Sequence, residues 1–319
     1  MTERIFVGLS TFVEFGRSPL DLLERSGFPF DVHVMGKGKR ITTEELLTKG
    51  ADATVIVAGV EPYDVKTLAS LPRLRCISRV GVGVDAIDLA EAKRRGIAVA
   101  NTPTIPSQAV AEMALACFLA LSRNLRAQAN ILAKGRWDRL SAHLLSGRTI
   151  GLIGFGRIGQ RVASLCRPFD ARVIAHDPFG DQSIAGSLGV ELVDMRALLS
   201  SGDIVSLHAS RQPGQSVLLG DAELAAMKPG VVVVNLARGG MLDEDALVRS
   251  LRSGHVAGAA LDVFAHEPYQ GPLGEFEQVI LTPHVSTLTV ETRVAMEVEA
   301  VENALAFLAG SIPAARRVV

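Results

Sequence analysis

The sequence predicts an α/β protein of two domains, each built around a mostly parallel sheet. Short apolar runs that are typical of buried strands alternate with longer segments that are typical of helices along the whole chain. A length of 319 residues suffices for two domains of ordinary size. Pro103 and Pro106 interrupt the alternation, and they suit a crossing between the domains.

The segment before Pro103 contains the elements of the first α/β unit. Ser18 is expected to cap a first helix, because a proline follows it at the first helical turn. Thr42-x-x-Glu45 has the spacing of a capping box ahead of a second helix. Gly96 is expected to end a later helix. Strands are predicted at residues 5–9, 31–35, 54–58, 74–78 and 97–100.

Two further segments follow the prolines. Ser107 is expected to cap a long apolar helix that runs to about Arg123. A helix that is apolar on most faces needs burial on most faces, so it could lie between domains or in a subunit interface. The segment from Ala127 to Leu140 is more polar, and we interpret it as an extended arm.

A glycine-rich turn, Gly154-x-Gly156-x-x-Gly159, stands between a predicted strand at 149–153 and a predicted helix at 157–166. Gly154 permits the tight turn, Gly156 lets a pyrophosphate approach the backbone, and Gly159 lets the helix lie close to the sheet. The N–H groups at the helix start would then face the phosphates. A glycine-rich turn without a ligand is the alternative. The strand, helix and second strand in this order favour a dinucleotide site.

Asp177 follows the second strand of this unit, which is predicted at residues 171–175. An acidic residue at this distance from the glycines can accept hydrogen bonds from the adenosine ribose. It would repel a 2′-phosphate, and the next arginine is as far away as Arg196. These features favour NAD over NADP. A surface aspartate without a ligand is the alternative.

The alternation continues to the end of the chain. A long C-terminal helix at about 289–308 is expected to return to the first unit, so the second unit would be inserted into the first. Between Asp177 and that helix, helices are predicted at 194–199, 221–227 and 243–252, and strands at 190–193, 203–208, 231–236, 257–264 and 278–281.

Three ionisable residues follow three of these strands: Arg238, Glu267 and His284. Ligands of open α/β sheets bind beyond the carboxyl ends of the strands. A histidine can take the proton of a secondary alcohol, a carboxylate can orient it, and an arginine can bind a substrate carboxylate. The set therefore suits hydride transfer to or from a 2-hydroxy acid. Singly, each residue has a structural alternative: Arg238 as a ligand of carbonyls, Glu267 as a turn cap, and His284 as a core histidine.

Composition excludes several other classes of function. The net charge of −1 gives no electrostatic reason to expect nucleic acid or an anionic membrane as a partner. Cys76, Cys117 and Cys166 lie in apolar runs without CxxC spacing, so buried reduced thiols are expected. The histidines lack metal-ligand spacing, and no metal is predicted. The N-terminus lacks a signal-peptide core, so a cytoplasmic protein is expected.

The sequence resembles the D-isomer-specific 2-hydroxyacid dehydrogenase family over nearly its whole length, and within that family it is most similar to the phosphoglycerate-dehydrogenase-like branch. The motifs that carry the resemblance are residues 78–85, Asn101-Thr102-Pro103, the glycine turn at 151–159, Asn235 to Gly240, Leu261 to Pro268, and Thr282-Pro283-His284.

The resemblance implies two Rossmann/flavodoxin-like domains, with the cofactor domain inserted into the substrate domain. It implies a substrate-binding domain of residues 1–101 and 286–319, and an NAD-binding Rossmann domain of residues 102–285. It also implies a cleft between the domains, hinge closure over the substrate, and a homodimer built largely on the cofactor domain.

The resemblance also implies roles for single residues. Arg238 would bind substrate, Glu267 would support the base, and His284 would be the acid–base. Backbone N–H groups of Val82 and Gly83 would bind the substrate carboxylate. The other substrate contacts are expected at Arg79 and Asn101, and the NAD contacts at Gly154, Gly156, Arg157, Ile158, Gly159, Asp177, His208, Ala237 and Asp262, the last on the nicotinamide amide.

This chain departs from the usual pattern of the family at several positions. Ser286 and Thr287 replace a common pair of glycines after His284, and these extra side chains could reshape the pocket. Residues 207–210 lack the proline that often follows that strand. No arginine of the phosphate-reading kind lies near residues 58–60, which weakens the case for 3-phosphoglycerate. Arg79 is a possible substitute anion donor or a structural residue.

The sequence therefore predicts an NAD-dependent dehydrogenase or reductase of D-2-hydroxy acids, of the phosphoglycerate, glyoxylate or hydroxypyruvate type. An NAD-sensing regulatory protein, similar to the transcriptional corepressors built on this fold, is the competing prediction. A dinucleotide-binding subunit without activity is a third.

Overall fold

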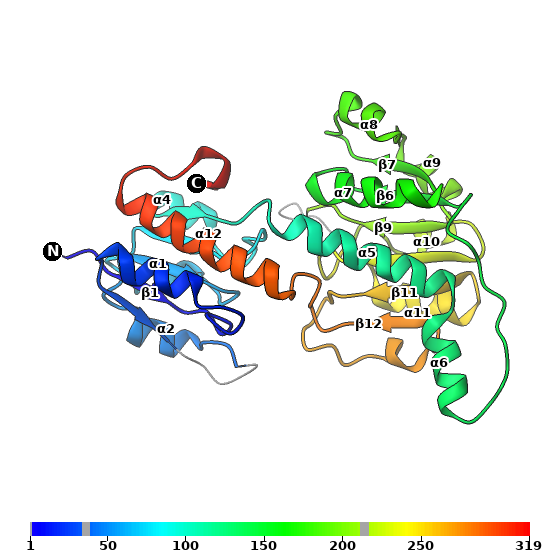
Figure 1. Ribbon diagram of the computed structural model, residues 1–319, viewed down its shortest axis with the longest axis horizontal. Coiled ribbons are helices and arrows are strands. Elements are labelled where there is room, and N and C mark those ends of the chain that lie inside the picture. Colours follow the sequence, from blue (N-terminus) through cyan, green and yellow to red (C-terminus); the bar gives the residue numbers. More distant parts are fainter. Residues whose placement is uncertain (1, 34–38, 211–216) are drawn as a thin grey trace. The chain divides into compact units, whose positions relative to one another are not determined.

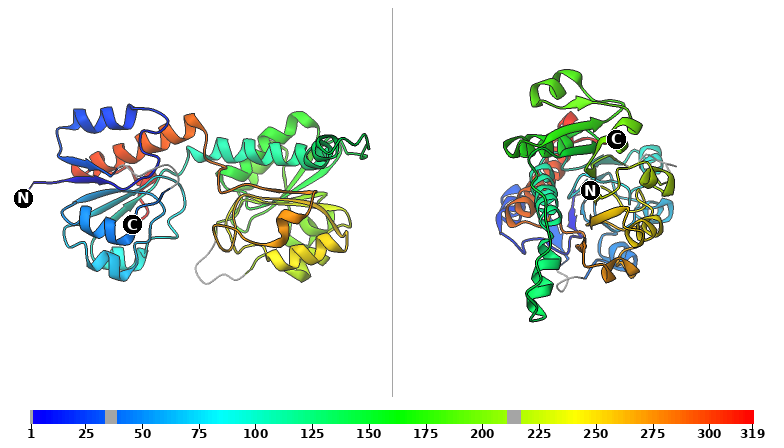
Figure 2. Two further views of the ribbon diagram at one scale, coloured as in Figure 1. Left: turned by 90° about the horizontal axis from the view of Figure 1, so that it is seen from below. Right: turned by 90° about the vertical axis from the view of Figure 1, so that its right-hand side faces the viewer.

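The computed structural model describes residues 2–33, 39–210 and 217–319. The chain divides into two compact units. The first unit contains Met1–Pro106 and Leu288–Val319, and the second is the continuous segment Ser107–Thr287. Both units are three-layered, with helices on both faces of a parallel sheet (Figures 1 and 2). The predicted α/β class with parallel sheets is confirmed.

The first unit has a five-stranded sheet in the order β2-β1-β3-β4-β5, with every pair parallel. Its strands are short and fully or partly buried. The strand expected at 31–35 corresponds to β2, and residues 34 and 35 lie outside the described residues. The strands are β1 (Ile5–Val7), β2 (Phe30–Val32), β3 (Val55–Ala58), β4 (Cys76–Arg79) and β5 (Ala98–Ala100).

Two apolar clusters cover the two faces of this sheet. One cluster is built with α1 and the C-terminal helix α12, and the other with α2, α3 and α4 (Figure 2). The predicted capping box is present, since Thr42 accepts from the N–H of Glu45 and the Glu45 carboxylate accepts from the N–H of Thr42. The helices are α1 (Ser18–Ser26), α2 (Thr43–Lys49), α3 (Val65–Ala69), α4 (Leu89–Arg94) and α12 (Val290–Leu308).

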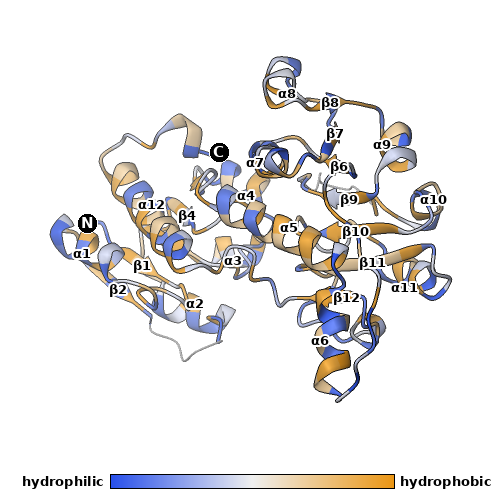
Figure 3. Ribbon diagram, turned by 45° about the vertical axis from the view of Figure 1, so that its right-hand side comes forward, coloured by the Kyte–Doolittle hydropathy of each residue, from blue (hydrophilic) through white to orange (hydrophobic). Residues whose placement is uncertain are grey.

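The second unit has a seven-stranded parallel sheet in the order β12-β11-β10-β9-β6-β7-β8. The order reverses at β6, whose neighbours are β7 and β9. Its central strands are mostly apolar, as Figure 3 shows. The strands are β6 (Thr149–Ile153), β7 (Arg172–His176), β8 (Glu191–Leu192), β9 (Ile204–Leu207), β10 (Val231–Asn235), β11 (Val256–Leu261) and β12 (Val279–Leu281).

Apolar clusters again form on both faces of the sheet. One contains residues of α5, α7 and α8, and the other contains residues of α9, α10 and α11. The helices are α5 (Pro106–Ser122), α6 (Leu125–Ala133), α7 (Arg157–Cys166), α8 (Gln182–Leu188), α9 (Met195–Ser201), α10 (Asp221–Ala225) and α11 (Glu244–Arg252), with short 3₁₀ turns η1 (Arg167–Phe169), η2 (Pro272–Glu275) and η3 (Ala314–Arg316), the last in the first unit.

Both predicted serine caps are wrong. Ser18 is the first residue of α1, whose N-cap position is occupied by Arg17 without a side-chain cap bond. Helix α5 already begins at Pro106, so Ser107 lies inside it, and its buried hydroxyl has no hydrogen-bond partner in the described part of the chain. In both cases the helix already includes the serine that was expected to cap it, because proline suits the first turn of a helix.

The extended arm predicted from Ala127 to Leu140 is only partly correct. Its first half belongs to α6, which buries Ala127 and Ile131. The guanidinium of Arg126 donates to the carbonyls of Phe276 and Val279, and so ties α6 to the β12 edge of the sheet. Residues 134–148 form neither helix nor strand. A contact between positions this distant in sequence has no local pattern, so it could not be read in advance.

The three cysteines are free and buried, as predicted. Burial raises the pKa of each thiol, Cys76, Cys117 and Cys166, to about 12. Within the described residues, none of the helices has the length and apolar character that a membrane crossing requires.

Candidate active site

The glycine-rich turn lies at the point where the strand order of the second sheet reverses. Gly154 follows β6 with a φ of 100°, a conformation that side-chain-bearing residues rarely adopt. A β-carbon there would lie 2.5 Å from the backbone nitrogen of Ala209, in the loop after β9. The loops after β6 and β9 therefore touch at the switch point, which is where open α/β sheets bind their ligands.

The start of α7 offers unpaired backbone donors beside this turn. A β-carbon at Gly159 would lie 2.3 Å from the carbonyl oxygen of Gly154, so only glycine lets the helix pack this closely. A β-carbon at Gly156 would meet nothing within 4 Å, so the backbone is open on that side. The N–H groups of Arg157 and Ile158 donate no hydrogen bond in the described part of the chain. The turn is therefore shaped to accept a phosphate group.

Asp177 lies against the same turn. Its carboxylate accepts hydrogen bonds from the N–H of Phe155 at 2.8 Å and from the N–H of Phe179 at 2.9 Å, one on each oxygen. Each oxygen keeps a second lone-pair position. The side chain is half-buried, so it is fixed next to the turn while part of it stays accessible.

His208 follows β9 and is buried next to the turn. Its Nε2 lies 2.8 Å from the Ser206 hydroxyl, and its buried Nδ1 has no partner within the described residues. Burial lowers the pKa of His208 to about 4, so the ring is neutral at physiological pH. An unpartnered polar atom of this kind suits a ligand contact at the carboxyl end of the sheet.

The predicted catalytic residues follow the neighbouring strands β10, β11 and β12. Because the carboxyl ends of parallel strands meet at one edge, the three loops are adjacent. A β-carbon at Gly239 would lie 1.8 Å from the carbonyl oxygen of Phe264, so the loops carrying Arg238 and Glu267 are in direct contact. The Arg238 guanidinium donates to the carbonyl of Ala237, whose own N–H donates to Asn235.

His284 and Glu267 form a hydrogen-bonded pair. The His284 Nδ1 lies 3.1 and 3.0 Å from the two Glu267 carboxylate oxygens. A carboxylate only accepts, so Nδ1 carries the proton and Nε2 of the neutral ring is the acceptor. The N–H of Phe264 donates to Glu267 at 3.3 Å and holds the carboxylate in place. The His284 side chain is 51% exposed, so its Nε2 can reach a substrate.

The backbone of His284 has a φ of 56°, in the left-handed region. For a residue with a side chain this conformation costs about 1–2 kcal/mol, and it persists only when the surroundings impose it. The surroundings here include Asp262, which is 1% exposed and accepts hydrogen bonds from Thr282, Val285 and Ser286 on either side of the histidine.

The predicted substrate-binding residues of the first unit lie around one turn after β4. Asn101 donates to the carbonyl of Val82 at 2.8 Å, and Thr102 accepts from the N–H of Gly81 at 2.8 Å. Within the described residues, the N–H groups of Val82 and Gly83 donate no hydrogen bond, and Val82 is exposed. The turn therefore presents two consecutive N–H groups, an arrangement that suits an anion.

Arg79 packs over that turn, since a β-carbon at Gly81 would lie 2.6 Å from its guanidinium. Behind it lies a buried cluster that the sequence analysis missed. Glu61 is 5% exposed and accepts hydrogen bonds from the N–H of Gly59 and the hydroxyl of Tyr63. Burial raises the pKa of Glu61, and the positive charge of Arg79 opposes this rise. A glutamate three residues after the buried strand β3 was the available signal in the sequence.

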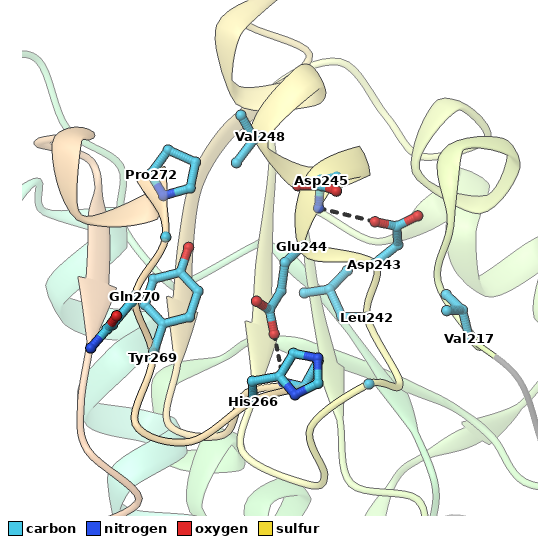
Figure 4. A pocket seen from close by; sticks show the side chains of 13 residues that line it. Val217, Leu242, Asp243, Glu244, Asp245, Val248, His266, Tyr269, Gln270 and Pro272 are labelled. Carbon is cyan, nitrogen blue, oxygen red and sulfur yellow. Dashed lines mark hydrogen bonds between the residues drawn. The ribbon is translucent and has the colours of Figure 1, made fainter.

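A cavity of about 540 Å³ lies at the start of α11, beside the loops that carry Arg238 and Glu267, since Gly240 and His266 line it. Its lining includes Asp243, Glu244 and Asp245 on one side and Tyr269 on the other (Figure 4). None of the three predicted catalytic residues lines it. Its acidic lining would repel a pyrophosphate or a carboxylate, so the cavity does not compete with the edge described above.

Comparison with known proteins agrees with this geometry. The model of the "D-isomer specific 2-hydroxyacid dehydrogenase, NAD binding domain" family matches residues 115–286. The solved structure of D-lactate dehydrogenase from Aquifex aeolicus, complexed with NAD and lactic acid, superposes with a TM-score of 0.86 at 27% identity, over 99% of both chains. The matched segment lies within the second unit, which therefore contains the NAD-binding domain of this family.

Two relatives show the range of the family. D-3-phosphoglycerate dehydrogenase of Mycobacterium leprae is 41% identical over 263 residues, 82% of this chain and 50% of that protein. The chain thus spans about half the length of such relatives. Glyoxylate reductase of Aeropyrum pernix is 37% identical over 97% of this chain and 94% of that protein. The chain belongs to the D-isomer specific 2-hydroxyacid dehydrogenase family.

Proposed function

We propose that this protein is an oxidoreductase that transfers a hydride between NAD(H) and a D-2-hydroxy acid or its 2-oxo acid. The observation that carries the proposal is the His284–Glu267 pair, with an accessible Nε2 at the carboxyl edge of an NAD-binding domain. The reaction is of the phosphoglycerate-dehydrogenase or the glyoxylate/hydroxypyruvate-reductase type, in keeping with the names of two relatives.

The residues of the second unit fit the cofactor. The open side of Gly156 and the free N–H groups of α7 would hold the pyrophosphate, and Asp177 would accept hydrogen bonds from the ribose hydroxyls. The negative charge of Asp177 disfavours the 2′-phosphate of NADP. Ala237 and the neutral ring of His208 complete the proposed contact set. When bound, the nicotinamide ring supplies the hydride acceptor or donor.

His284 acts as the general base in oxidation and as the general acid in reduction. In oxidation its Nε2 takes the proton of the substrate hydroxyl, while a hydride leaves the carbon that bears this hydroxyl. Glu267 keeps the proton on Nδ1 and stabilises the imidazolium that forms. The microscopic reverse returns the proton to the carbonyl oxygen during reduction.

Arg238 and the turn after β4 recognise the acid. Arg238 binds the carboxylate or the adjacent carbonyl through its planar fork of donors. The N–H groups of Val82 and Gly83 bind the substrate carboxylate, and Asn101 keeps their turn in shape. Arg79, which packs over this turn, has a positive charge suited to a second anionic group on the substrate.

The test is NADH consumption with glyoxylate, hydroxypyruvate, phosphohydroxypyruvate, pyruvate and branched 2-oxo acids, with NADPH in parallel. We expect turnover with NADH, and a clear preference within the panel. A preference for phosphohydroxypyruvate that Arg79→Ala abolishes would assign Arg79 to the phosphate. Tight NADH binding without turnover of any acid would contradict the proposed oxidoreductase activity and favour an NAD-sensing protein.

A further inference from the structure

The buried carboxylate of Asp262 is completely occupied by the turn that carries His284. Its Oδ1 accepts from the Thr282 hydroxyl at 2.5 Å and from the N–H of Val285 at 2.8 Å. Its Oδ2 accepts from the N–H and the hydroxyl of Ser286, at 2.8 and 2.5 Å. A carboxylate has about four lone-pair sites, so these four bonds use them all.

This occupancy changes the role expected for Asp262. The resemblance to the family implies a contact with the nicotinamide amide, but a carboxylate with four donors has no position left for a fifth. Asp262 is also only 1% exposed, so a ligand would have to displace one of the present donors. Its four bonds come from two backbone N–H groups and two side-chain hydroxyls of Thr282, Val285 and Ser286, which flank His284.

Ser286 contributes a bond that glycine, common at this position in the family, cannot make. The residue is 5% exposed, and its hydroxyl is buried against the carboxylate. A hydrogen bond to a charged acceptor is about twice as strong as a neutral one. The side chain therefore adds a strong bond on the C-terminal side of His284, opposite the bond from Thr282 on the N-terminal side.

The bonds on the two sides together hold an unfavourable backbone conformation. His284 has a φ of 56°, and its N–H donates to the carbonyl of Thr282 at 3.0 Å across Pro283. Glu267 contacts only the ring, so the orientation of the main chain depends on Asp262 and its donors. If the turn relaxed, Nδ1 would move from Glu267 and Nε2 would move from the substrate.

We propose that Ser286 is a positioning residue, which together with Thr282 locks Asp262 and thereby fixes the turn that presents His284. The proposal rests on the proposed function, since it concerns the acid–base of that reaction. Asp262 acts in it through the turn that carries His284.

The kinetic test uses Ser286→Ala and the isosteric variant Thr282→Val. We expect each to lower kcat about tenfold, because small displacements of a catalytic group are costly, while the Kd for NADH stays within about twofold. Thr292→Val is the matched control, since it removes a buried threonine hydroxyl of α12 that accepts a hydrogen bond from Thr289, the N-cap residue of that helix. This control should keep the wild-type kcat.

A second measurement reports the His284–Glu267 geometry without any turnover. Nitrogen NMR of the labelled histidine rings, at a pH where they are neutral, distinguishes the two ring tautomers, and a His284→Gln variant assigns the signal. We expect the wild-type ring to be protonated on Nδ1 alone. Ser286→Ala should give a mixture of both tautomers, and Thr292→Val should not.

The outcomes separate the two proposals. If Ser286→Ala shows a mixture of tautomers but the wild type turns over no 2-oxo acid, the positioning role is supported and the proposed function is overturned. An unchanged kcat in both turn variants would overturn the positioning role. A fall in NADH affinity that matches the fall in kcat, with the ring still protonated on Nδ1, would also overturn it and would assign Asp262 to the cofactor.

Discussion

His284 is the residue on which the proposed chemistry depends most. Its ring is oriented from one side by Glu267, and its accessible Nε2 is the expected proton acceptor. We expect His284→Ala to reduce kcat by about 10²–10⁴-fold, the range for loss of a general acid–base, while NADH binding stays unchanged. His143→Ala is the control, because His143 is an exposed histidine outside the site. Near-normal kcat in His284→Ala would remove His284 from the reaction.

His208 makes stability depend on pH. Unfolded histidine titrates near 6.5, and burial lowers the pKa of folded His208 to about 4. Above pH 6.5, His208 is neutral in both the folded and the unfolded protein. Below pH 6.5 the unfolded chain takes up a proton first, so the folded state loses stability until the pH reaches about 4. The loss approaches about 3 kcal/mol, because one pKa unit corresponds to about 1.4 kcal/mol.

The measurement for His208 is urea unfolding of the wild type and of His208→Gln across this pH window. The difference between the two proteins isolates His208 from the buried carboxyl groups that titrate in the same region. We expect the difference in unfolding free energy to be constant above pH 6.5 and to move in favour of His208→Gln as the pH falls towards 4. A difference that stays constant throughout would show that the buried ring becomes charged.

At the scale of elements, the unit formed by β6, the glycine turn and α7 separates packing from binding. Gly159→Ala should destabilise the fold by about 1–3 kcal/mol, because its β-carbon would meet the Gly154 carbonyl oxygen and force helix and turn apart. Gly156→Ala has a free β-carbon position and a φ of −74°, so it should keep the stability and weaken NADH binding. Thermal unfolding and NADH fluorescence titration of both variants measure the two effects. Equal losses of stability would contradict this separation.

At the scale of the whole molecule, the two units differ in how the chain builds them. The second is one continuous segment with apolar clusters on both faces of its sheet, and it contains all the residues proposed to bind NAD. The first needs α12, whose Met296, Ala300, Val301 and Ala304 complete one of its clusters. The N-terminal segment alone therefore lacks part of its core.

The chain of residues 107–287 should therefore fold alone. We expect it to unfold cooperatively in urea and to bind NADH, because its cores and its glycine turn are complete. It should not turn over 2-oxo acids, since it lacks the turn with Val82 and Gly83. The matching experiment on the first unit is deletion of 290–319, which should abolish cooperative unfolding of that unit. Loss of NADH binding by the isolated segment would show that the cofactor site needs the first unit.

Local signals in the sequence were sufficient for most elements of the fold. Strands such as β10 are β-branched runs, the capping box at Thr42 satisfies its own helix end, and the spacing of Gly154, Gly156 and Gly159 contains the whole strand–turn–helix geometry. Helices α3, α6 and α8 were missed, and two of them are short, with five residues in α3 and seven in α8. For α6 the stabilising contact comes from the β12 edge, far away in the chain.

What the sequence by itself determined is therefore the class of the fold, the cofactor turn and the three strand ends that carry Arg238, Glu267 and His284. These follow from contacts within one element or from the rule that parallel strands end at the same edge. The pairing of Nδ1 with Glu267, the buried Glu61 and the four bonds of Asp262 were decided by the tertiary structure. Hydrogen bonds between loops depend on where packing brings distant side chains, and no periodicity in the chain encodes that distance.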